Sequence, residues 1–197
     1  MKLNTKDKIL QTAARCIATQ GIERTTTRRI AEMAGVSRGL VPYYIPKRKD
    51  LLFEVINYIF RTVQSKARKN IADLTGVDFL LVALRTNFEE FLGKPHYYAC
   101  FLLSYYYAHF NKKFLKLHTE QYRHNRTRFI QLLEVEAQKK GKTFSPESLA
   151  LKAEEVLDLL DGGLLFYSAV EHELTLLEYT DRRMKIIENN LNLFLAT

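Results

Sequence analysis

The chain has 197 residues, of which 47% are hydrophobic and 26% charged, with 8 Gly, 4 Pro and a formal net charge of +8. These proportions are close to those of an average globular protein, so they exclude the disordered, collagen-like and disulfide-scaffold classes. The two cysteines, Cys16 and Cys100, form no CxxC motif. No apolar run suits a signal peptide or a transmembrane helix, so we expect a reduced, cytoplasmic protein without membrane contact.

Positive charge is concentrated near the N-terminus. Residues 1–50 contain eleven Lys and Arg but only four Asp and Glu, whereas residues 51–197 contain 19 basic and 18 acidic side chains. A local excess of this sign favours a polyanion or an anionic surface as partner. Charge alone leaves open a solvated basic face that has no partner.

Apolar residues recur with helical spacing along nearly the whole chain, which predicts an all-α fold of eight or nine helices. The first is expected over about 5–19, with Thr5 as N-cap and Gly21 at its end. In a later helix, Ser145 is the expected N-cap and Pro146 the first helical residue. The expected helices after the first span about 27–34, 37–45, 47–72, 77–92, 96–110, 112–140, 145–175 and 181–195.

Residues 27–45 have the pattern of a helix-turn-helix. Thr27 is expected to cap the first helix, and Gly35 to end it in the left-handed conformation. Ser37 is expected to cap the second helix. The other positions that fit are inward-pointing Ile30 and Met33, Ala31 at the helix crossing, Val36 between the helices and Val41 beneath the second one.

A second helix of this kind presents its N-terminal residues to base edges in the major groove, while neighbouring groups hold phosphates. Arg38 is the candidate for a bidentate guanine contact, with a phosphate contact as the equal alternative. Lys47 and Arg48 lie before the next helix, where a merely solvated turn is the alternative. The predicted DNA-binding residues are Thr27, Arg28, Ser37, Arg38, Gly39, Tyr43, Tyr44, Lys47 and Arg48.

Residues 5–56 resemble the DNA-binding domain of TetR-family transcriptional regulators. The resemblance rests on the Ile-Ala and Ala-Gly-Val-Ser elements between Thr26 and Ser37, and on the run from Tyr44 to Leu52 with Arg48 in its basic slot. It implies a helix-turn-helix domain over 1–50 and a helical ligand-binding and dimerisation domain over 51–197. One departure is Pro42, which stands where the family usually has an aromatic residue inside the recognition helix. In a helix capped by Ser37 its missing N–H would delete a bond to the Arg38 oxygen, so a later start or a kink is the alternative.

The resemblance further implies a homodimeric regulator, most often a repressor, that binds a palindromic operator and leaves it when a small molecule binds. Two C-terminal helices of each subunit form the family's four-helix interface; their alternative role is an intrachain core with two tolerated glycines, Gly162 and Gly163. The residues expected at the dimer interface are Val156, Leu160, Gly163, Leu164, Ile187, Leu191 and Phe194.

Residues 96–110 contain seven Phe and Tyr. Buried tyrosines need partners for their hydroxyl groups, so this segment suits a cavity for a lipophilic or aromatic ligand, or a cationic one if Glu89 or Glu90 faces inward. Ordinary core packing is the alternative for any one residue. The predicted ligand-binding residues are Phe88, Phe91, Tyr98, Phe101, Tyr105, Tyr106 and Phe166.

Enzyme motifs are missing from the sequence. It has no HExxH, no GxSxG and no phosphate-binding glycine loop, and no histidine follows a glutamate by three residues. We therefore expect no enzyme, no cofactor and no metal, although a metal site built from distant histidines stays open. The alternative function is a helical small-molecule-binding protein with only nonspecific affinity for DNA.

Overall fold

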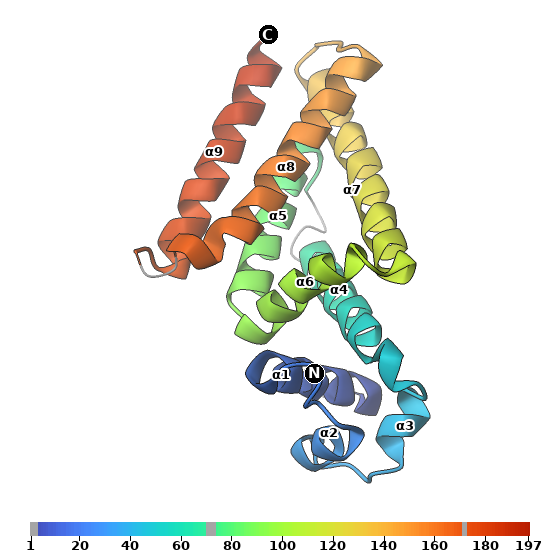
Figure 1. Ribbon diagram of the computed structural model, residues 1–197. Helices are drawn as coiled ribbons and strands as arrows, with labels where there is room; N and C mark the ends of the chain where they lie inside the picture. Colours follow the sequence, from blue (N-terminus) through green and yellow to red (C-terminus); the bar gives the residue numbers. More distant parts are fainter. Residues whose placement is uncertain (1–3, 70–73, 171–172) are drawn as a thin grey trace. The chain divides into compact units, whose positions relative to one another are not determined.

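The computed structural model describes residues 4–69, 74–170 and 173–197. Within these ranges the fold is all-α, with nine α-helices, one short 3-10 helix (η1) and no strand (Figure 1). The elements in chain order are α1 (Thr5–Gln20), α2 (Thr27–Ala34), α3 (Leu40–Tyr44), η1 (Arg48–Asp50), α4 (Leu51–Lys69), α5 (Gly76–Leu92), α6 (Pro95–Ala108), α7 (Lys112–Lys139), α8 (Pro146–Val170) and α9 (Leu176–Ala196).

Packing divides the chain into two compact units. Unit 1 contains residues 1–64 and 94–115, and unit 2 contains residues 65–93 and 116–197. The first part of α4 and the whole of α6 therefore pack with the N-terminal helices. The boundary expected at residue 50 concerns function rather than packing, and it stays a prediction.

Unit 1 is built around α1, whose apolar side chains face α2 on one side and α6 on another. Ile9 and Ala13 are fully buried there, and the Cys100 thiol of α6 lies 3.8 Å from the main-chain oxygen of Ala14. Both cysteines are unpaired and buried. Burial raises the pKa of the Cys100 thiol to about 12 and also raises that of Cys16.

Unit 2 has a core in which α5, α8 and α9 contact one another. Phe88 of α5 is fully buried and lies where α8 has a glycine: a Cβ added to Gly163 would come within 2.8 Å of the Phe88 ring. The Tyr179 hydroxyl of α9 donates to the Gly163 main-chain oxygen over 2.5 Å. Gly163 thus permits a close approach of helices within the chain.

The predicted starts of α1, α9 and α3 are wrong, in addition to the cap of α2, which is described with the candidate site. Asn4, not Thr5, caps α1, because its side-chain oxygen accepts from the Asp7 N–H. The last helix begins at Leu176 rather than near 181. Thr175 and Glu178 form a capping box at this earlier start. The third error, at α3, lies in the candidate site. Ser145 does cap α8, since it accepts from the Ser148 N–H at 3.1 Å.

The predicted end of the helix expected over 47–72 lies outside the described residues, whereas the helix expected over 145–175 does not reach 175, since residues 173–175 are not helical and Thr175 already caps α9. Among the described residues, no helix is both long and apolar enough to cross a membrane.

Candidate nucleic-acid interface

The N-terminus of α2 presents the first predicted contacts. Thr26 caps the helix by accepting from the Arg29 N–H at 3.2 Å, so the prediction of Thr27 as the cap is wrong by one residue. Thr27 and Arg28 lie in the exposed first turn. The free N–H groups at such a helix start attract phosphate. This turn is therefore suited to contact the phosphate backbone of DNA.

The turn after α2 has the expected geometry at its first residue. Gly35 has φ +58, and the Val36 N–H donates to the Ala31 oxygen at 3.1 Å. Ile30, Ala31 and Val41 are buried as predicted, and Val36 is half-buried. Met33 is 47% exposed, so its predicted inward position is wrong; its sulfur contacts the Cys16 thiol at the edge of the α1–α2 contact.

The helix expected from Ser37 begins instead at Leu40, with Gly39 as its N-cap, so Ser37 is not the cap. Pro42 explains the shift. As the third helical residue, it falls among the positions whose N–H has no helical partner, so its missing donor costs no bond. The bond that it could not make would run to the Arg38 oxygen, and Arg38 stays in the turn before α3.

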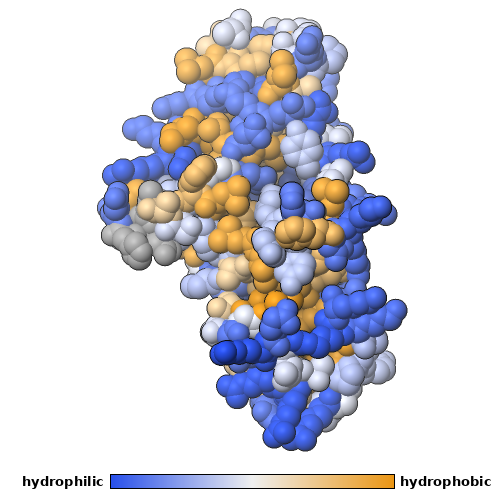
Figure 2. All heavy atoms as spheres, viewed as in Figure 1, coloured by the Kyte–Doolittle hydropathy of each residue, from blue (hydrophilic) through white to orange (hydrophobic). Residues whose placement is uncertain are grey.

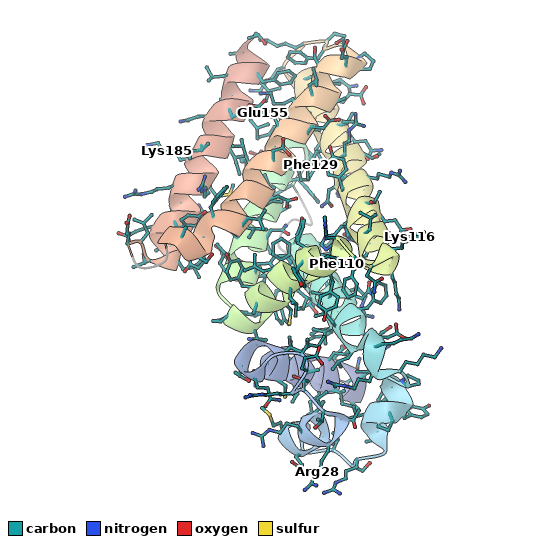
Figure 3. All side chains as sticks on the ribbon, in the orientation of Figure 1. Arg28, Phe110, Lys116, Phe129, Glu155 and Lys185 are labelled. Carbon is teal, nitrogen blue, oxygen red and sulfur yellow. The ribbon has the colours of Figure 1, made fainter. Side chains whose placement is uncertain are left out.

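Two exposed arginines flank this turn. The side chains of Arg28 and Arg38 are 71% and 70% exposed, and Figure 3 shows Arg28 pointing away from α2 into solvent. Both contact the same carboxylate oxygen of Glu32: Arg28 Nε donates to it at 2.9 Å, and an Arg38 nitrogen lies 3.7 Å away. Ser37 and Gly39 are also exposed beside Arg38.

The two predicted tyrosines have different surroundings. Tyr43 is 74% exposed on α3, whereas Tyr44 is half-buried and contacts it edge-to-face at 5.0 Å. Tyr44 lines a pocket of about 240 Å³ together with Pro46 and Glu54. Tyr43 is therefore the freer of the two for a contact outside the chain.

The basic turn Lys47–Lys49 precedes α4. Lys47 and Lys49 are exposed, while Asp50 bonds to Lys113 at 2.7 Å. The hydrogen bond from Lys113 holds the pKa of Asp50 below its usual value, and the neighbouring charges of Lys49 and Lys47 add to this effect. Lys113 thus balances the acid of this turn. Blue, hydrophilic surface predominates over α2 and α3 in Figure 2.

Arg48 has a different role from its neighbours. Its guanidinium donates to three main-chain oxygens of the loop between α1 and α2: those of Ile22 at 2.9 Å, Glu23 at 3.0 Å and Thr25. Thr25 immediately precedes Thr26, the cap of α2. The charge of Arg48 predicted a contact with phosphate. In the structure its N–H groups instead bind the loop that precedes the α2 N-terminus.

The predicted ligand residues divide between the units. Phe88 and Phe91 are buried in unit 2, where Phe166 is 64% exposed. Unit 1 holds the other four: Tyr98 and Phe101 are buried, Tyr105 is half-buried and Tyr106 is 62% exposed.

Glu89 and Glu90, the two acids that could face a cationic ligand, both contact basic side chains of the protein. Glu90 contacts Lys66, and Glu89 lies 3.9 Å from Arg85. Their charges are therefore already balanced in part within the protein, which weakens the case for a cationic ligand.

The predicted dimer residues lie inside unit 2. Val156, Leu160, Leu164, Ile187 and Leu191 are at most 4% exposed; Gly163 is buried and Phe194 is half-buried, stacking on Phe144 at 4.4 Å. These side chains pack within their own chain, so they are not free to meet a partner. Exposed apolar side chains do occur on the same two helices: Leu151, Leu165, Phe166, Leu177, Ile186 and Leu193.

Comparison with known proteins identifies the head formed by α1 to α3. Residues 9–55 match the family model described as "Bacterial regulatory proteins, tetR family". The head therefore has the sequence of a TetR-family DNA-binding domain. Its match to the HTH-type transcriptional regulator LuxR of Vibrio harveyi is 34% identical over 91 residues, which is 41% of this chain and 44% of that protein.

Solved structures extend the likeness in fold to nearly the whole chain. A putative transcriptional regulator of Pseudomonas aeruginosa PAO1 superposes with a TM-score of 0.76 at 20% identity, covering 97% of this chain and 90% of that one. A putative transcriptional regulator of Saccharomonospora viridis in complex with choline gives 0.71 at 19% identity, covering 94% and 96%. The chain thus shares the fold of these proteins, a helix-turn-helix followed by a helical C-terminal part, and the family that its residues 9–55 match consists of regulatory proteins.

Proposed function

We propose that the chain is a ligand-responsive repressor that binds a palindromic operator as a homodimer. The observation that carries the proposal is the exposed pair Arg28 and Arg38 on either side of the α2–α3 turn, next to the free first turn of α2. In this arrangement Arg38 reads base edges, while Thr27, Arg28, Lys47 and Lys49 hold phosphates. Tyr43 adds an exposed hydroxyl beside them. A regulator of this kind acts on DNA in the cytoplasm.

A mobility-shift series with duplexes from the region upstream of the gene tests DNA binding. We expect one duplex to bind in a sequence-dependent, salt-sensitive complex with a dimer, and a scrambled duplex to bind more weakly. Equal affinity for both duplexes would instead favour a small-molecule-binding protein with only nonspecific DNA affinity.

Replacing Arg38 by alanine should remove sequence preference rather than binding itself. A lost bidentate base contact costs about 1–3 kcal/mol of discrimination, so the affinity for the operator duplex should fall about 10- to 100-fold, while that for scrambled DNA changes little. Fluorescence anisotropy with both duplexes measures this. Equal losses on both would assign Arg38 to a phosphate.

We further propose that the dimer forms through the outer faces of α8 and α9. Leu151 and Leu165 lie two heptads apart on α8, and Ile186 and Leu193 one heptad apart on α9, so each pair shares a helix face. Orange, apolar surface lies over this part of unit 2 in Figure 2. A group of exposed apolar side chains on neighbouring helices is typical of an interaction surface.

Replacing Phe166 by glutamate tests this interface. Phe166 is 64% exposed, so the variant should fold, but it should elute as a monomer in size-exclusion chromatography with light scattering. Leu115, 53% exposed on α7, is the control: its replacement by glutamate should leave the dimer intact. A Phe166→Glu protein that remains a dimer would place the interface elsewhere.

The effector is proposed to be a small lipophilic or aromatic molecule held among helices of unit 2, near Phe88 and Phe91. The choline complex of the Saccharomonospora viridis regulator supports small-molecule binding in this fold. Bound there, the effector would favour a conformer whose two recognition helices no longer match half-sites about 34–36 Å apart. Isothermal titration with candidate compounds, followed by release of the labelled operator, tests this step.

A further inference from the structure

Glu32 lies between the two arginines that the proposed function places on DNA. It is one helical turn after Arg28 on α2, and its Oε1 atom accepts from Arg28 Nε at 2.9 Å. The same oxygen lies 3.7 Å from an Arg38 nitrogen in the turn before α3. One carboxylate thus spans the two elements of the helix-turn-helix.

The surroundings of Glu32 keep it ionised at neutral pH. The hydrogen bond from Arg28 holds the pKa of Glu32 below its usual value, and the charges of Arg28, Arg38 and Arg29 act in the same direction. The same hydrogen bond raises the pKa of Arg28. A full negative charge therefore stands at the surface that would face the DNA backbone.

This arrangement does little for the stability of the fold. All three side chains are largely exposed, and ion pairs at such positions contribute little because water and salt screen them. The carboxylate also repels phosphates, which costs affinity for any DNA. A residue that weakens binding and barely stabilises the protein needs another explanation.

We propose that Glu32 determines specificity: it competes with phosphates for Arg28 and Arg38, and gives them up only to a site that satisfies both. This inference rests on the proposed function, because it needs sequence-dependent DNA binding. On random DNA, each arginine would only replace the Glu32 oxygen by a phosphate oxygen, and this exchange gains little free energy. On the operator, the planar guanidinium of Arg38 gains two bonds to a guanine, which Glu32 at 3.7 Å does not offer.

Two variants of Glu32 test separately the effect of its charge and the effect of its side-chain length. Glu32→Gln keeps the shape of the side chain and removes the charge. Glu32→Asp keeps the charge, but its shorter side chain cannot reach Arg28 and Arg38 together. The matched control is Glu23→Gln, which removes an exposed acid from the loop before α2 and leaves the main-chain bond from Arg48 in place.

The experiment measures the affinity of each protein for the tightest upstream duplex and for a scrambled duplex, at several salt concentrations. For Glu32→Gln we expect scrambled DNA to bind about tenfold more tightly and the upstream duplex about twofold, with the salt slope on scrambled DNA steeper by about one. Glu32→Asp should also lower the ratio of the two affinities, although its net charge is unchanged. Glu23→Gln should tighten both duplexes equally.

An equal gain of Glu32→Gln on both duplexes, or no change in the ratio, would overturn the inference while leaving the proposed function intact. A normal ratio for Glu32→Asp would also overturn it, since charge alone would then explain the effect. If the wild-type protein itself shows no preference for any upstream duplex, the proposed function fails. The two failures are therefore distinguishable in one set of titrations.

Discussion

Replacing Arg48 by lysine is expected to weaken operator binding and lower the melting temperature of the protein, although the charge is unchanged. The guanidinium donates to the oxygens of Ile22, Glu23 and Thr25. A lysine ammonium lacks the planar fork that reaches three carbonyls at once. Losing these charge-assisted bonds should cost about 2 kcal/mol, which corresponds to a decrease in melting temperature of about 4–8 °C for a protein of 197 residues.

The loss of DNA affinity should follow from the position of the loop. Without Arg48, the residues before Thr26 are released, and the α2 N-terminus no longer holds Thr27 and Arg28 in place. We expect operator affinity to fall at least tenfold, with a shallower salt slope because the displaced Arg28 loses its phosphate. The accompanying decrease in melting temperature distinguishes this result from the loss of a direct phosphate contact of Arg48.

Lys47→Gln and Lys49→Gln are the controls for a direct phosphate contact. Each removes an exposed charge from the same turn and should weaken binding to every DNA sequence, reduce the salt slope by about one and leave the melting temperature unchanged. If Arg48→Lys matched the wild type in both affinity and melting temperature, Arg48 would act by charge alone, as its sequence position first indicated.

The two neighbouring glycines of α8 should respond in opposite ways to alanine. In Gly163→Ala the new Cβ comes within 2.8 Å of Cε1 and Cζ of Phe88, whose ring is fully buried. Overpacking of this kind costs about 1–3 kcal/mol, which outweighs the gain of about 1 kcal/mol in helix propensity. We expect a net loss of stability of up to about 2 kcal/mol.

Gly162→Ala is the matched control, because nothing lies within 4 Å of a Cβ built there. It should keep the full propensity gain and stabilise the protein by about 1 kcal/mol. Urea unfolding of both variants, followed by circular dichroism, measures the difference. Equal stability of the two would mean that Phe88 moves aside at no cost.

Much of the helix-turn-helix could be predicted because its signals are local. Gly35 ends α2 in the left-handed conformation, and Ile30 and Val41 point into the core, as their spacing indicates. The start predicted for α3 followed the capping signal of Ser37, whereas Pro42, which has no N–H, favours a helix that begins only at Leu40. The start of α9 had a readable signal, the spacing of Thr175 and Glu178.

The roles of buried residues could not be read in the same way. Helical periodicity shows that Leu160 and Leu191 face an apolar partner, but not whether that partner is the same chain or another; the structure buries both within unit 2. Likewise, the aromatic content of residues 96–110 predicted that Phe101 binds a ligand. In the structure, α6 packs against α1, a helix some eighty residues earlier. Contacts between segments so distant leave no local pattern.

The burial of both thiols makes the protein convenient for spectroscopy. Only a thiolate attacks maleimides or peroxide, and at neutral pH on the order of one Cys100 side chain in 10⁵ is in that form. Cys16 is also buried and has a raised pKa. A single cysteine engineered at an exposed site would therefore take up a spin or fluorescent label selectively, and distances between two labelled heads could be followed without first removing the native cysteines.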